Sequence, residues 1–202
     1  MIETLASEGY EGRGFVGDAG NEEQLQRAFE QVKDWNGDIS VLIYNAAILN
    51  PDSVLNITPH SMAESMAVNL GGAINSVNQV LPSMRENIGG TILITGGGLA
   101  LEPYPNWTAL SAGKAALRSY AISLYKALEQ ENIHVAVIAV CGIVANDGLF
   151  DPDLIAEEYW RLHSEEKANW KRELIYLPDG ADAYYNDPDG DHRLTSLPIE
   201  RG

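Results

Sequence analysis

Short apolar runs alternate with longer segments of helical period along most of this chain. Strands are predicted near residues 39–44, 91–95 and Ile133–Val140, with further strands at residues 14–17 and 174–176. Strands separated by helices are typical of a parallel sheet that helices cover on both faces. The sequence therefore predicts an α/β fold.

Four helices are predicted around these strands. The first begins after Asn21, a residue that caps helices well, carries glutamates in its first turn, and ends near Trp35-Asn36-Gly37. The longest apolar stripe starts near Ser61 and repeats at intervals of three and four residues. The later helices are expected at about residues 61–87, 107–131 and 151–164.

The length of the chain sets its domain organisation. A chain of 202 residues, 45% of them hydrophobic, is long enough to bury one substantial core. We expect a single domain over residues 1–176. Residues 177–202 are rich in Asp, Gly and Pro, so they are expected to form a loop-rich C-terminal tail.

The charge of the chain excludes two classes of partner. Its 29 acidic and 13 basic residues give a formal net charge of -16, which repels nucleic-acid backbones and anionic membranes. No apolar run reaches the roughly 20 residues of a membrane span, no secretory signal is visible, and the single Cys141 cannot form an internal disulfide. The four histidines share no metal-ligand spacing. We expect a soluble cytoplasmic protein without a metal site.

Three consecutive motifs between residues 89 and 144 resemble one enzyme family. They read Gly-Gly-Thr-Ile-Leu-Ile-Thr-Gly-Gly-Gly, Leu-Ser-Ala-Gly-Lys-Ala-Ala-Leu-Arg and Ile-His-Val-Ala-Val-Ile-Ala-Val-Cys-Gly-Ile-Val. Upstream, Tyr44-Asn45-Ala46-Ala47 is similar to the sequence Asn-Asn-Ala-Gly, and Val16-Gly17-Asp18-Ala19 to a strand end whose aspartate contacts adenine. This order resembles the short-chain dehydrogenase/reductase family over roughly residues 1–150. The resemblance implies a Rossmann-like doubly wound parallel sheet and an NAD- or NADP-dependent oxidoreductase acting on an alcohol or carbonyl.

The resemblance also assigns site residues. The family works with Asn, Ser, Tyr and Lys, of which Asn69 and Lys114 match the asparagine and the lysine. The serine position holds Gly97 and the tyrosine position holds Leu110, so both proton-handling hydroxyls are missing. The cofactor-binding residues implied by the resemblance are Asp18, Asn45, Ala46, Lys114 and Ile143.

Loss of the tyrosine removes a general acid. A positioned general acid contributes about 10²- to 10⁴-fold in rate, and leucine has no proton to exchange. Ser111 lies one residue later, so its side chain is rotated by about 100° and should face away from Lys114. Tyr104, in the loop before the helix, is the better geometric substitute, although a packed loop tyrosine is also common.

Two further features leave alternatives open. The glycines at 96–98 either let a ligand approach the backbone or form a tight turn after the strand. Tyr159, Trp160 and Trp170 either form an aromatic lid over a ring-bearing ligand or cover the core.

The glycine-rich turn with which the family begins has no counterpart before Asp18. Aligned on Asp18, the resemblance implies an N-terminally truncated chain, in which the first two strands and the first helix would be missing. The strand at residues 14–17 would then lack a lateral partner, and the strand at residues 39–44 would expose an edge. Direct pairing of these two strands, pairing with another subunit, or a further N-terminal segment would each compensate.

Two function hypotheses follow. The first is an NAD(P)-dependent oxidoreductase, impaired or inactive as this 202-residue chain. The second is a non-catalytic pseudoenzyme that acts as a binding or dimerisation module. A small-molecule substrate and a homodimer or homotetramer are the expected partners, and a gene fragment without function is a third reading.

Overall fold

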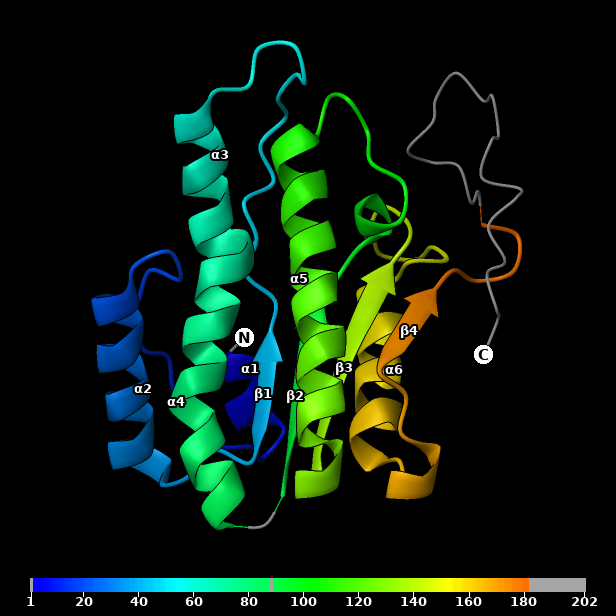
Figure 1. Ribbon diagram of the computed structural model, residues 1–202. Helices are drawn as coiled ribbons and strands as arrows, with labels where there is room; N and C mark the ends of the chain where they lie inside the picture. Colours follow the sequence, from blue (N-terminus) through cyan, green and yellow to red (C-terminus); the bar gives the residue numbers. More distant parts are fainter. Residues whose placement is uncertain (1, 88, 182–202) are drawn as a thin grey trace.

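The computed structural model describes residues 2–87 and 89–181, and these residues fold around one four-stranded parallel sheet (Figure 1). The sheet order is β1-β2-β3-β4, and every neighbouring pair is parallel. The strands are β1 Val41–Tyr44, β2 Gly90–Thr95, β3 Ile133–Val140 and β4 Glu173–Tyr176.

Helices connect β1 to β2, β2 to β3 and β3 to β4, as the sequence predicted, whereas two helices precede β1. A short α1 precedes α2, which packs beside α4 at the edge of the molecule (Figure 1). Asn21 accepts a hydrogen bond from the backbone N–H of Gln24, which confirms its predicted role as the N-cap of α2. The α-helices are α1 Ile2–Ser7, α2 Glu22–Asn36, α3 Pro59–Met66, α4 Ala73–Glu86, α5 Thr108–Leu128 and α6 Pro152–Ser164.

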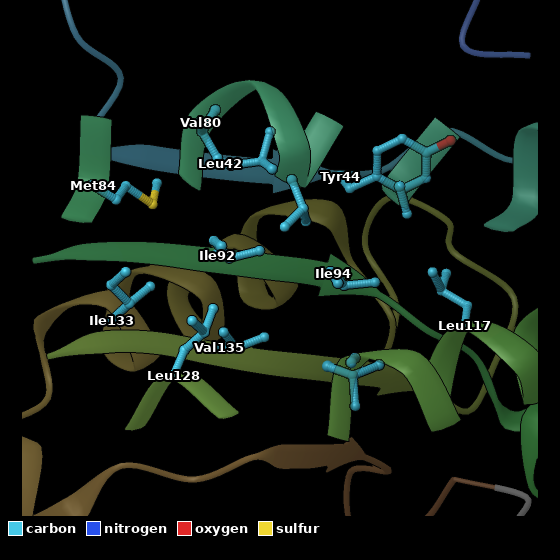
Figure 2. Close-up of a cluster of buried hydrophobic side chains, with 14 residues drawn as sticks. Leu42, Tyr44, Val80, Met84, Ile92, Ile94, Leu117, Leu128, Ile133 and Val135 are labelled. Carbon is cyan, nitrogen blue, oxygen red and sulfur yellow. The ribbon is translucent and has the colours of Figure 1, made fainter. Parts of the chain in front are cut away.

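The sheet is covered on both faces, which confirms a doubly wound α/β fold. On one face, Val77 and Val80 of α4 and Leu117 of α5 pack against Ile92 and Val135 of the sheet (Figure 2). On the other face, α6 buries Ile155 and Leu162 against Leu93 and Ile138. The alternation of Ile92 and Leu93 between the two cores is the period-two pattern of a strand.

The connection from β3 to β4 differs in hand from the earlier ones. The sheet grows in one direction from β1 to β4, yet α4 and α5 lie on one face and α6 on the other. The β3–α6–β4 crossover therefore has the opposite hand to the two crossovers before it, and right-handed crossovers are strongly preferred. This reversal places α6 on the face opposite α4 and α5.

The long helix predicted from Ser61 is divided in three. Thr58 and Ser61 form a capping box at the start of α3, and a π-helical segment, Ala67–Gly72, separates α3 from α4. A side chain at Gly72 would collide with the Tyr44 hydroxyl and the Ala19 carbonyl oxygen. Close packing against β1 therefore explains the glycine inside this helix.

The predicted strand at residues 14–17 is wrong. These residues have no strand conformation and no partner in the sheet, and Val16 is 95% exposed. A strand needs a neighbour for its backbone hydrogen bonds, and the described sheet offers none here. Direct pairing of this segment with β1 does not occur.

The predicted exposed edge is present. β1 pairs with β2 alone and so forms one edge of the sheet, and β4 forms the other. The final strand predicted at residues 174–176 is confirmed as β4. Of the predicted C-terminal tail, residues 182–202 lie outside the described part of the chain. None of the helices within residues 2–87 and 89–181 has the length and apolar character of a membrane span.

Candidate functional site

Polar groups gather where β1, β2 and β3 end. Asn45 follows β1, Thr95 ends β2, and Cys141 follows β3. The carboxyl ends of parallel strands meet at one edge of a sheet, and ligands of open α/β sheets bind there. Lys114 reaches this edge from α5.

Lys114 is a buried cation with one hydrogen-bond partner among the described residues. Its side chain donates from Nζ to the backbone carbonyl oxygen of Thr95 at 2.7 Å, and the residue is 7% exposed. None of the ion pairs among the described residues includes it. Burial lowers the pKa of Lys114 to about 8, because the charged form loses its hydration without gaining a counter-charge.

The surroundings of Lys114 contain no hydroxyl at the two predicted positions. Leu110 lies one helical turn before Lys114 and is buried. Gly97 stands across from the lysine, where a Cβ atom would lie 4.0 Å from Lys114 Cε. The structure thus brings Gly97, Leu110 and Lys114 together. Neither Gly97 nor Leu110 carries a side-chain proton that it could transfer.

Asn69 is fully buried and both ends of its amide are occupied. Its Oδ1 accepts from the backbone N–H of Ile48 at 2.8 Å, and its Nδ2 donates to Ser65 Oγ at 2.9 Å. A Cβ at Gly113 would approach Asn69 Cβ to 2.8 Å, so glycine allows α5 to pack here. Asn69 therefore joins the segment after β1 to the helix that carries Lys114.

Ser111 and Tyr104 hold a loop to α5. The Ser111 hydroxyl is buried and accepts from the backbone N–H of Tyr104 at 3.3 Å. This bond fixes the backbone of the loop and occupies the serine oxygen. The glycines at 96–98 form a turn in which Gly96 donates to Ile138 O and Gly98 begins a 3-10 helix, which matches the tight-turn interpretation.

A hydroxyl pair that the sequence motifs did not indicate lies beside this site. Thr95 Oγ1 and the Tyr159 hydroxyl of α6 are 2.6 Å apart. Burial is the larger influence on Tyr159 and raises its pKa, while the hydrogen bond with Thr95 acts in the opposite direction. Thr95 thus contacts Lys114 through its carbonyl and Tyr159 through its side chain. Two separate signals were present in the sequence, the position of Thr95 at the end of a strand and the aromatic segment that contains Tyr159, but nothing joined them.

A cavity of about 570 Å³ extends from this pair between the sheet and α6. Its walls are mainly apolar, with Asn45, Thr95, Tyr159 and His163 as polar groups. The lining residues are Val41, Ile43, Asn45, Leu93, Thr95, Val140, Val144, Pro152, Ile155, Ala156, Tyr159, Trp160 and His163.

The remaining predicted cofactor residues are spread out. Asp18 Oδ1 accepts from the backbone N–H of Gly20 at 2.8 Å and so stabilises the turn before α2. Asn45 lines the cavity, Ala46 packs against the core, and Ile143 is 79% exposed.

The helix N-termini among the described residues offer no seat for a pyrophosphate. A helix N-terminus binds phosphate through free backbone N–H groups. Asn21 and Thr58 cap α2 and α3, and carboxylates of Asp52 and Asp151 accept from the first N–H groups of α5 and α6. A carboxylate in this place repels a phosphate. Within the described ranges no cluster of three or more acidic, His or Cys side chains could hold a metal ion.

A comparison with known protein families gives one match over most of the chain. The family model described as short chain dehydrogenase matches residues 1–148. The chain belongs to the short-chain dehydrogenase family. This membership agrees with the parallel sheet and with the position of Lys114 at its carboxyl edge.

Curated relatives in this family are longer than the chain. Dehydrogenase/reductase SDR family member 4 of Sus scrofa is 28% identical over 140 residues, covering 68% of this chain and 50% of that protein. The 3-oxoacyl-[acyl-carrier-protein] reductase of Haemophilus influenzae is 28% identical over 139 residues, covering 69% and 57%. The chain spans about half the length of these relatives.

Solved structures share the fold. A short-chain dehydrogenase from Rhodopseudomonas palustris superposes with a TM-score of 0.76 at 23% identity, covering 88% of this chain and 82% of that one. A metagenomic short-chain oxidoreductase in complex with NADP superposes with a TM-score of 0.77 at 19% identity, covering 88% and 78%.

Proposed function

We propose that the chain is an NAD(P)-dependent oxidoreductase by descent whose hydride transfer to a carbonyl, or from an alcohol, is impaired or lost. The observation that carries this proposal is the environment of Lys114. The lysine is buried beside Leu110 and Gly97, and neither residue can donate a proton.

Retention of Lys114 supports a remaining cofactor role. A buried ammonium with one carbonyl partner costs stability, so its presence suits a ligand that brings further acceptors. A ribose would bring two hydroxyl oxygens. Solved relatives with the same fold were crystallised with NADP or NADPH, which supports a nicotinamide dinucleotide as the ligand class. The unpaired Cys141 suits the reducing cytoplasm.

A fluorescence titration with NADH and NADPH tests the binding half of the proposal. We expect saturable binding that Lys114→Met weakens by about tenfold or more, since the substitution removes the charged donor. Lys126→Met is the matched control, because Lys126 lies exposed in the last turn of the same helix. Absence of binding at millimolar cofactor, or equal affinities for wild type and Lys114→Met, would refute this role.

A second candidate is a non-catalytic binding or dimerisation module. The exposed side of α5 carries the small residues Ala115 and Ser119, which would let another helix approach closely. We propose that the chain forms a homodimer or homotetramer through this face of α5. Sedimentation of the wild type and of Ala115→Arg measures it, and a monomeric wild type at all concentrations removes this candidate.

A further inference from the structure

The cavity between the sheet and α6 has an open, apolar mouth. In Figure 1, α6 lies behind the sheet, on the side away from α4 and α5. Ile43 of β1 and Trp160 of α6 both line the cavity, and they are 52% and 70% exposed. A concave volume of about 570 Å³ with mainly apolar walls is typical of a site for a small molecule.

The register of β1 and β2 gives this cavity a flat floor. Ile43 pairs with Leu93, and Asn45 and Thr95 follow two positions later, so the four side chains share one face. Neighbouring strands lie about 4.8 Å apart, and alternate residues along a strand lie about 6.6 Å apart. A fused two-ring system has these dimensions. The floor is apolar at Ile43 and Leu93 and polar at Asn45 and Thr95.

The polar end of the floor can both donate and accept hydrogen bonds. The side-chain amide of Asn45 has no hydrogen-bond partner within residues 2–87 and 89–181, and it carries a donor and an acceptor side by side. The hydroxyl pair of Thr95 and Tyr159 shares one hydrogen over 2.6 Å, which leaves the second hydrogen for a ligand. Burial raises the pKa of Tyr159, so its hydroxyl stays protonated at neutral pH.

The walls of the cavity favour an uncharged ligand. Among the described residues that line it, none is Asp, Glu, Lys or Arg. An ion would therefore lose its hydration without gaining a counter-charge. The net charge of -16 also repels anions. His163 is the lining side chain that could become a cation, and its Nδ1 already lies 3.0 Å from Thr91 Oγ1.

Two of the three aromatic residues that the sequence analysis left open face this cavity. Tyr159 and Trp160 line it, whereas Trp170 stacks on His134 at 4.7 Å between ring centroids. The Trp160 ring meets His163 edge to face, with centroids 5.6 Å apart, which orients the indole at the mouth. Aromatic rings attract each other beyond the burial of their area. An exposed indole in this position suits a ring-bearing ligand.

We propose that this cavity binds an uncharged fused-ring compound that carries an N–H beside a C=O, as a cyclic amide does. The rings lie over Ile43 and Leu93 and against Trp160. The amide edge meets the Asn45 carboxamide, donor to acceptor and acceptor to donor, with the hydroxyl pair beside it. This edge explains why the only polar groups of the floor lie at one end.

The inference goes beyond the proposed oxidoreductase function and does not rest on it. Lys114 reaches Thr95 from α5 and contacts its backbone carbonyl oxygen, whereas the Thr95 side chain faces α6. The ligand therefore needs no contact with Lys114 and no nicotinamide cofactor.

The compound 2-quinolone, a two-ring cyclic amide, is the probe. We expect calorimetric titration of the 202-residue chain to show one saturable site with a Kd below about 1 mM. In the isotope-labelled chain, the indole N–H resonance of Trp160 should shift as the site fills. Methylation of the ring nitrogen, as in 1-methyl-2-quinolone, should weaken binding about fivefold because it removes one hydrogen bond. Quinoline-2-carboxylate, an anion, should not bind at the same concentration.

Four variants locate the ligand. Asn45→Leu should weaken 2-quinolone about fivefold and abolish the difference between the two quinolones, a result that a merely structural effect would not give. Ala156→Phe places a ring in the cavity and should weaken binding by about tenfold or more. Ala168→Phe, at an exposed residue of the 3-10 helix Lys167–Asn169, is the matched control and should bind as the wild type does. Lys114→Met should also leave the affinity unchanged.

Several results would overturn the proposal. These are no saturable binding at about 1 mM 2-quinolone, equal affinity of the methylated compound, or unchanged binding by Ala156→Phe. Equal losses in Ala168→Phe would indicate adsorption to the surface, and a loss in Lys114→Met would move the ligand to the Lys114 site. A wild-type dimer that Ala156→Phe dissociates would assign the cavity to a second copy of the chain. None of these readouts depends on cofactor binding or catalysis, so their failure leaves the proposed function standing.

Discussion

The Lys114 ammonium donates to the Thr95 carbonyl oxygen at 2.7 Å, at the point where β2 ends. This bond joins the helix that the family uses for catalysis to the strand end that carries the Tyr159 contact. A single carbonyl oxygen stabilises a buried ammonium only weakly. We therefore expect Lys114 to lower the stability of the protein and to contribute to ligand binding instead.

Replacement of Lys114 by methionine should stabilise the protein. Methionine fills the same space without a charge, and we expect the free energy of unfolding at neutral pH to rise by about 1 to 3 kcal/mol. Urea denaturation measures the change, with Lys126→Met as a control that should stay within about 0.5 kcal/mol. A destabilised Lys114→Met variant would show that the ammonium has a stronger partner than Thr95.

The same lysine predicts a rise of stability in alkaline solution. Its pKa is about 8 in the folded chain and 10.5 ordinarily, so the unfolded state binds more protons between these values. Stability should therefore increase with pH across this window in the wild type. The slope should be smaller in Lys114→Met, and parallel pH profiles of the two proteins would contradict the assignment.

His134 predicts a loss of stability in acid. It is 1% exposed, stacks on Trp170 and contacts the Lys171 carbonyl, and burial lowers its pKa below the ordinary 6.5. The folded state holds the neutral ring, so stability should fall as pH drops below about 6.5. Thermal unfolding of His134→Phe between pH 5 and 7 should show a weaker pH dependence than that of the exposed His60→Asn control.

Two neighbouring glycines should respond in opposite directions. Gly72→Ala would press a methyl group on Ala19 and Tyr44 and should destabilise the protein by about 1 to 3 kcal/mol. Gly71→Ala meets only the Met66 carbonyl oxygen at 3.7 Å and should be neutral or stabilising by up to about 1 kcal/mol. Thermal unfolding compares them, and equal losses would mean that close packing is not the reason for Gly72.

Strands and helices could be predicted from the sequence where two independent local patterns, such as an apolar run and its flanking residues, indicated the same element. Ile133–Val140 is an apolar run between helical segments, and α2 has both an N-cap and a terminal glycine. The strand at residues 14–17 failed because a strand also needs a neighbour, which no local pattern specifies. The π-helical segment Ala67–Gly72 depends on packing against β1, so the helical period alone did not indicate it.

The site was predictable where it depended on motifs and unpredictable where it depended on packing. Lys114, Gly97 and Leu110 could be placed together because the resemblance to the family assigns all three to one site, and the structure confirms that they lie close to one another. The Thr95–Tyr159 contact joins residues 64 positions apart and arises from the reversed crossover that places α6 under β2. The spacing of residues in the sequence does not indicate the reversed hand of the β3–α6–β4 crossover.

Steady-state reduction of a broadly reactive carbonyl, phenanthrenequinone, at saturating NADPH tests the central claim most directly. The double variant Gly97→Ser, Leu110→Tyr restores both hydroxyls, and Gly97 has extended backbone with room for a Cβ. We expect the wild type to be at least about 10²-fold slower than this variant, because it lacks the proton donor. A wild-type rate equal to or above that of the variant would contradict the account.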